Sequence, residues 1–169
     1  MNFRERILRP YSKTEVQAMV QYVGGETERF DELMKVFLHS EYRVSQRASW
    51  VVTHCAEAFP WLISPYLPQL LAYLQQNEVS ETVVRNTVRL LQFVEIPETL
   101  HGPVTDLCFG YLTKSDVPAA VKAFSITVLE RLTHLYPDLR EELVLILEDQ
   151  LPYQSPAFVS RAKKVLGRK

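Results

Sequence analysis

The sequence of 169 residues predicts an all-α protein made of repeated helix pairs. Three observations support this fold class. Apolar residues recur at helical spacing in several segments, proline interrupts the helical segments at a regular interval, and the alternating pattern of strands is absent from the sequence. Pro60 and Pro137 each follow an aromatic residue at the end of a helical segment, and they lie 77 residues apart, about two units of 38 or 39. A period between about 20 and 50 residues is typical of helical solenoids.

The first expected element is a short N-terminal helix within residues 1–25. Ser12 and Glu15 have the Ser-x-x-Glu spacing of a capping box. Gly24 and Gly25 end this helix, because glycine readily adopts the left-handed backbone conformation that closes many helices. We therefore expect residues 1–25 to form a capping helix at the start of a single repeat domain that spans residues 1–169.

Four helix pairs are expected to fill residues 26–169. In the first helix of each pair, apolar residues at i, i+4 and i+8 share one helix face. The four sets are offset by 36, 38 and 39 residues, and they are Phe30/Met34/Leu38, Tyr66/Leu70/Leu74, Val104/Cys108/Leu112 and Leu143/Leu147/Leu151. The expected pairs are 26–38 with 41–59, 65–76 with 80–95, 99–114 with 117–136, and 138–151 with 155–166.

The second helix of each pair shares a valine that we expect to face the core. These residues are Val44, Val84, Val121 and Val159, offset by 40, 37 and 38. Polar residues that can accept an unpaired backbone N–H precede the four helices, and they are Ser40, Ser80, Asp116 and Ser155. Pro118 and Pro156 then fall in the first turn, where the missing amide donor costs little. The segment 99–114 has the lowest helix propensity, since it contains Gly102, Pro103 and Gly110.

These features resemble the HEAT-repeat (armadillo-like) family over about residues 26–169. The resemblance rests on the period of about 38 residues, on the turn Ser or Asp before a V-x-x-x-[AVS] helix, and on "VRNTVRLL" at 84–91. It implies a short right-handed α–α superhelix of about four helix pairs with an extra N-terminal helix, whose second helices line a concave surface. It also implies a scaffold or adaptor role, although a smaller HEAT-like group, the alkylpurine DNA glycosylases, acts on damaged DNA. Ser45 and Ser160 depart from the usual basic residue after the shared valine.

Composition points to an ordinary protein of a reducing compartment. The net charge of −1 gives no argument for binding nucleic acid or a membrane through the whole molecule. The N-terminal "MNFRERILRPYSK" lacks the apolar stretch of a secretory signal, and no window has the roughly 18 apolar residues of a membrane span. Cys55 and Cys108 lie far apart in apolar surroundings, so we expect two buried thiols and a cytoplasmic location.

Enzyme motifs are missing from the sequence. It contains no Gly-rich phosphate loop, no HExxH and no CxxC, and its four histidines are scattered among the repeats. The expected inner helices hold only Glu57, Glu95 and Glu130 as candidate catalytic carboxylates, and no Asp. We therefore expect no catalysis, no cofactor and no metal ion.

Charge is distributed unequally between the two sets of helices. The second helices, counted over 41–59, 80–95, 117–136 and 155–169, carry eleven Lys or Arg and five Asp or Glu, a net of +6. The first helices with their flanking turns, counted over 26–38, 61–78, 98–116 and 138–152, carry four and thirteen, a net of −9. With the shared valine toward the core, residues one, five and nine positions later point away from it. Position two adds Arg161 and position six adds Trp50. The expected partner-binding residues on the basic concave side are Trp50, Arg85, Arg89, Phe93, Lys122, Ile126, Arg161 and Lys164.

The predicted function is therefore a protein-interaction or scaffold module that binds an acidic protein or peptide in a basic concave groove. Aromatic residues and arginine are the side chains that interface hot spots favour. The alternative is DNA binding, or DNA alkylation repair by a glycosylase of the HEAT-like type, with Trp50 stacking on a base and cations contacting phosphates. Nucleic acid ranks below protein because the basic residues are sparse and separated by acidic ones. No membrane partner is expected.

Overall fold

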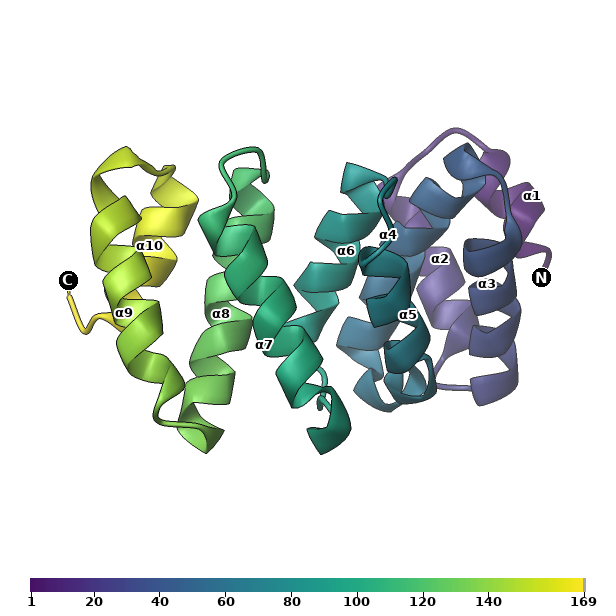
Figure 1. Ribbon diagram of the computed structural model, residues 1–169. Helices are drawn as coiled ribbons and strands as arrows, with labels where there is room; N and C mark the ends of the chain where they lie inside the picture. Colours follow the sequence, from purple (N-terminus) through teal and green to yellow (C-terminus); the bar gives the residue numbers. More distant parts are fainter. Residues whose placement is uncertain (169) are drawn as a thin grey trace. The chain divides into compact units, whose positions relative to one another are not determined.

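The computed structural model describes residues 1–168, and over these residues it contains α-helices joined by short turns and no strand (Figure 1). This confirms the predicted all-α fold class. Contacts between residues divide the chain into two compact units, Met1–Glu95 and Ile96–Lys169, which are described separately.

The first unit contains six α-helices. They are α1 (Phe3–Leu8), α2 (Lys13–Val23), α3 (Thr27–His39), α4 (Tyr42–Ala58), α5 (Leu67–Leu74) and α6 (Glu81–Leu91). The long helix α4 is central, because α2, α3 and α6 all pack against it. Two short 3₁₀ turns, Pro60–Leu62 and Ser64–Tyr66, connect α4 to α5, so the proline-rich stretch after α4 is a junction between helices, as predicted.

The second unit contains two helix pairs. They are α7 (Glu98–Thr113) with α8 (Ala119–Leu135), and α9 (Leu139–Gln150) with α10 (Pro156–Val165). Helix α8 is packed against α7, α9 and α10. Despite its glycines, α7 is continuous, and Pro103 lies inside it with an exposed side chain. The packing of Val104, Cys108 and Leu112, which are all fully buried, outweighs the low helix propensity of this segment.

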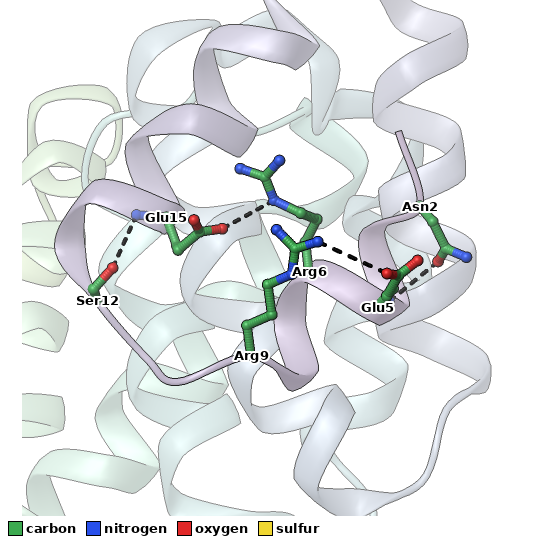
Figure 2. Close-up of polar contacts among 6 residues, drawn as sticks. All are labelled: Asn2, Glu5, Arg6, Arg9, Ser12 and Glu15. Atoms are coloured by element: carbon green, nitrogen blue, oxygen red, sulfur yellow. Dashed lines mark hydrogen bonds and ion pairs between the residues drawn. The ribbon is translucent and has the colours of Figure 1, made fainter.

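Helix α1 was not predicted: residues 1–25 form two helices instead of one. The Asn2 side chain accepts a hydrogen bond from the Glu5 N–H (3.1 Å; Figure 2). Phe3 and Ile7 are buried one turn apart. At the start of α2, the Ser12 hydroxyl accepts from the Glu15 N–H (3.1 Å), which confirms the predicted cap. The Glu15 carboxylate pairs with Arg6 of α1 (2.9 Å), so a contact between the two helices replaces the second half of the capping box.

Three of the four caps predicted for the second helices are wrong. Ser155 does accept from the Phe158 N–H (3.3 Å). Ser80 is the N-cap residue of α6, as expected, but its hydroxyl accepts from Gln46 Nε2 of α4 (2.8 Å) and makes no cap hydrogen bond. Helix α4, expected after Ser40, has Glu41 as its N-cap residue, one position later. Helix α8, expected after Asp116, has Pro118 as its N-cap residue, two positions later.

Nine of the twelve predicted stripe residues of the first helices are buried, whereas Leu38, Tyr66 and Leu151 are half-buried, and Tyr66 and Leu151 lie in 3₁₀ turns outside the α-helices. The shared-valine register of the second helices is wrong by one residue in two of them. Val44 and Val121 are fully buried. In α6 the buried residue is Val83, and in α10 it is Phe158, whereas the neighbouring Val84 and Val159 are half-buried. Two adjacent apolar residues make either register plausible from sequence, and only packing of the whole stripe chooses between them. The corrected core positions are 44, 83, 121 and 158.

Candidate functional site

The register correction changes which expected partner-binding residues are accessible. In the second unit, Ile126 is fully buried and Lys122 is 4% exposed, so the expectation that they face a groove is wrong. Arg161 of α10 is half-buried, donates to Thr127 Oγ1 of α8 (2.6 Å) and lies 5.9 Å from the centre of the Phe124 ring. These contacts join α10 to α8. Only Lys164 of these four is exposed.

In the first unit, two more of the expected residues take part in contacts between α4 and α6. Arg89 Nη2 donates to Glu57 Oε2 (2.8 Å), and Nη1 lies 3.4 Å from Thr53 Oγ1. The Arg89 guanidinium also lies 5.6 Å from the centre of the Phe93 ring. Arg89 therefore joins α6 to α4, with Phe93 beside its guanidinium, and charge reversal at Arg89 would disturb this helix pairing as well as any surface.

The remaining two residues, Trp50 and Arg85, line a hollowed surface along α4. A hollow of about 830 Å³ lies between α2 and α4, and it has the size of a typical ligand pocket. Trp50, His54 and Glu57 line it from α4, where their i, i+4 and i+7 spacing puts them on one helix face. The Trp50 and His54 rings meet edge to face, with centroids 4.9 Å apart. The opposite wall is formed by α2, where Val16 and Val20 contribute apolar side chains and Lys13, Gln17 and Gln21 polar ones.

A second hollow of about 320 Å³ lies between α4 and α6. It is lined by Arg47 and Trp50 of α4 and by Arg85 and Asn86 of α6. Tyr11 and Trp50 line both hollows, so the two meet at these aromatic side chains. We call the two hollows together the α4 groove.

Tyr11 is held at the groove by Arg47. The Arg47 guanidinium donates to the carbonyl oxygens of Ile7 (3.0 Å) and Arg9 (3.2 Å), at the end of α1. The Arg6–Glu15 ion pair also ties α1 to the first turn of α2, which follows the loop (Figure 2). The loop that carries Tyr11 is thus fixed at both ends, which positions an otherwise exposed aromatic ring.

The α4 groove carries more positive than negative charge. Lys13, Arg47 and Arg85 line it, whereas its single lining carboxylate, Glu57, is already paired with Arg89. Burial lowers the pKa of His54, and the charges of Arg89 and Lys13 lower it further against the opposing effect of Glu57. His54 is therefore neutral at pH 7.

Asn86 is a buried polar residue at the smaller hollow. It is 1% exposed, and its Nδ2 donates to Ser49 Oγ (2.9 Å). Its Oδ1 accepts no hydrogen bond from the part of the chain that the structure describes. An unpaired buried acceptor of this kind costs folding free energy, of the order of 1–3 kcal/mol.

Other chemistry has little support in the structure. Burial raises the pKa of Cys55 and Cys108 to about 12, so neither thiol is reactive near neutral pH. Among residues 1–168, no three His, Cys, Asp or Glu side chains are grouped so as to hold a metal ion. No helix in the same range has both the length and the apolar character needed to cross a membrane.

Sequence reasoning found Trp50 and Arg85 but missed most of the groove. His54 and Glu57 share a helix face with Trp50, so their spacing was a usable signal. No sequence signal pointed to Tyr11 or Asn86, because only folding of the chain brings them beside α4.

Comparison with known proteins gives a family and no relatives. A family model for the HEAT repeat domain matches residues 3–169, and it confirms the family predicted from the repeat period. No curated protein and no solved structure is significantly similar to the chain.

Proposed function

Because the chain belongs to the HEAT repeat family, we propose that it is a non-enzymatic interaction module that binds an acidic segment of another protein in the α4 groove. HEAT repeats generally mediate protein–protein interaction or scaffolding, and the family is typically non-enzymatic. The observation that carries the proposal is the meeting of two hollows at Tyr11 and Trp50, with Lys13 on one side and Arg85 on the other.

The composition of this groove suits a protein segment. Trp, Tyr and Arg are the residues that most often dominate binding energy at protein interfaces, especially where they line a hollow. Tyr11 is 56% exposed, so its ring has surface to bury against a partner. The surrounding cations are expected to accelerate association with an acidic segment and to make binding weaken as salt rises.

Charge reversal tests the proposal. The variant K13E/R85E reverses the two exposed cations of the groove, and K35E/R43E reverses two exposed cations elsewhere on the same unit, with the same change in net charge. Glutamate at position 13, in the first turn of α2, also suits the helix dipole. In affinity capture from native lysate, we expect acidic proteins on the wild type and on K35E/R43E, and their loss from K13E/R85E. Equal capture by all three proteins would refute the assignment of the groove.

Nucleic acid, including DNA repair by a glycosylase, is a second candidate. Trp50 lies among cations, and Glu57, a candidate catalytic carboxylate, lines the same hollow. Stacking of a base on Trp50 and phosphate contacts to Lys13 and Arg85 would bind a single strand. Gel-shift titrations with single-stranded and duplex DNA test this directly. Binding that weakens steeply with salt and is lost in Trp50→Ala would favour nucleic acid over protein, whereas no binding at low salt would remove this candidate.

A further inference from the structure

Resting on the proposed function, we propose that His54 contacts a carboxylate of the bound acidic segment and takes up a proton as the segment binds. The α4 groove therefore holds its partner more tightly at mildly acidic pH than at neutral pH. His54 in this way determines both the chemistry that the groove selects and the conditions under which the partner is released.

The His54 side chain is accessible from the larger hollow. It lines this hollow and is 32% exposed, so a ligand can reach it. The edge-to-face contact with Trp50, with centroids 4.9 Å apart, restricts the orientation of the imidazole ring. The Nδ1 atom lies 3.7 Å from Glu57 Oε2, beyond hydrogen-bond distance, and neither ring nitrogen makes a hydrogen bond to the part of the chain that the structure describes. His54 is thus a positioned polar group that is available to a ligand.

The charges around His54 keep the imidazole neutral in the unbound groove. Burial is the main cause that lowers the pKa of His54, and Arg89 of α6 and Lys13 of α2 lower it further, whereas α1 and α3 supply no charge that shifts it. Glu57 of the same helix raises this pKa, but its Oε2 is already paired with Arg89 (2.8 Å). Tyr11, which lines the same hollow, stays neutral because burial raises its pKa. The described residues around the hollow therefore offer a protonated His54 no unpaired anion.

A carboxylate that enters the hollow reverses this balance. An opposite charge within about 4–6 Å favours the protonated imidazole and raises its pKa, by about one unit in a groove open to water. Because binding raises the pKa, binding takes up a proton, and the affinity increases as the pH falls toward the pKa of the unbound histidine. A rise of one unit corresponds to at most about ten-fold in affinity, of which about five-fold is expected between pH 7.5 and pH 5.5.

The probe for the test is an acetylated pentapeptide amide of sequence EEFEE, with QQFQQ as its uncharged control. Its glutamates stay ionised at pH 5.5, above their usual pKa of about 4.3. In isothermal titration calorimetry, we expect EEFEE to bind the wild type about five-fold more tightly at pH 5.5 than at pH 7.5. The difference should disappear in His54→Gln. It should persist in His39→Gln, which replaces an exposed histidine at the end of α3 that lines neither hollow.

Two measurements on the unaltered groove decide the matter even where His54→Gln folds poorly. Calorimetry at pH 6.5 in buffers of different ionisation enthalpy counts the protons taken up on binding, and we expect a fraction of a proton for EEFEE and none for QQFQQ. In an NMR titration, the midpoint for the His54 imidazole should move to higher pH when EEFEE is bound, whereas the midpoint for His39 should stay where it is.

The outcomes distinguish this inference from the proposed function. If EEFEE binds in an Arg85-dependent way, but equally at both pH values and without proton uptake, the role of His54 is wrong and the groove stands. A pH dependence that survives in His54→Gln leads to the same conclusion. If EEFEE binds no better than QQFQQ at either pH and K13E/R85E has no effect on either peptide, both proposals fail. A thymidine pentanucleotide that binds with proton uptake where EEFEE does not would assign the groove to nucleic acid and overturn both.

Discussion

The corrected register of α6 can be tested with two adjacent valines. Val83 is 1% exposed and Val84 is half-buried, although both lie in the same helix and the same substitution, valine to alanine, is available at each. Truncating Val83 removes two buried carbons, worth about 0.8 kcal/mol each in transfer free energy, and leaves a small cavity. We expect V83A to lower the free energy of unfolding by about 2 kcal/mol.

Truncating Val84 should cost much less. Part of its side chain is already in solvent, and alanine has the higher helix propensity by roughly 0.5 kcal/mol, which offsets the smaller loss of packing. We therefore expect V84A to change the free energy of unfolding by about 0.5 kcal/mol or less. The sequence register, in which Val84 is the core residue, requires the reverse order.

Urea unfolding followed by tryptophan fluorescence measures this difference. Trp50 and Trp61 are the only tryptophans of the chain, and both belong to the unit Met1–Glu95 that contains α6. The signal therefore reports the unit in which the substitutions lie. The unfolding midpoint of V83A should fall clearly below that of V84A at an unchanged slope. A V84A variant as unstable as V83A would refute the corrected register.

Three further predictions concern other parts of the fold. Leu147→Ala, at a fully buried position of α9, should cost about 2–5 kcal/mol, whereas Leu145→Ala, at a position 62% exposed, should cost about 0.5 kcal/mol or less; far-UV circular dichroism during thermal unfolding measures both. Arg47→Met should release α1 and the loop bearing Tyr11, which hydrogen exchange would detect as faster exchange of the amides of α1 and this loop, with the other helices unchanged. Burial lowers the pKa of His54 from its usual value of 6.5, so the unfolded chain binds more protons than the folded one as the pH falls through about 6.5. The free energy of unfolding should therefore fall as the pH drops through this value, and His54→Gln should make that fall shallower.

The fold was predictable because its signals are local and repeated. Each first helix keeps a stripe of apolar residues at i, i+4 and i+8, and four copies of one pattern reinforce one another. The same repetition caused the register error. Val84 and Val159 were aligned with Val44 and Val121 because all four are valines, but in α6 and α10 the buried face begins one residue earlier. Helix α1 was missed because six residues show barely two turns of a pattern, and its stability comes mainly from the burial of Phe3 and Ile7 against the rest of the unit.

The site was predictable only in part because it depends on contacts between distant residues. Tyr11 and Asn86 are 39 and 36 residues away from Trp50 in the sequence, and Arg47 holds the loop that brings Tyr11 to the groove. Outward-facing positions counted from a valine gave Arg85 correctly, but they also gave Lys122 and Ile126, which are buried in the fold. Helical periodicity separates a buried face from the rest, but it does not separate solvent from a neighbouring helix.

The most direct test of the α4 groove is site-specific photo-cross-linking. A benzoylphenylalanine in place of Tyr11 lies at the meeting point of the two hollows, and the same group in place of Tyr153, which is 87% exposed in the other unit, serves as the control. After irradiation in native lysate, mass spectrometry identifies the attached segment. We predict acidic protein segments cross-linked from position 11, their loss when Arg85 is changed to Glu, and none of them from position 153. Cross-links of the same proteins from position 153 and not from position 11, or attachment to nucleic acid at position 11, would contradict the proposed protein-binding groove.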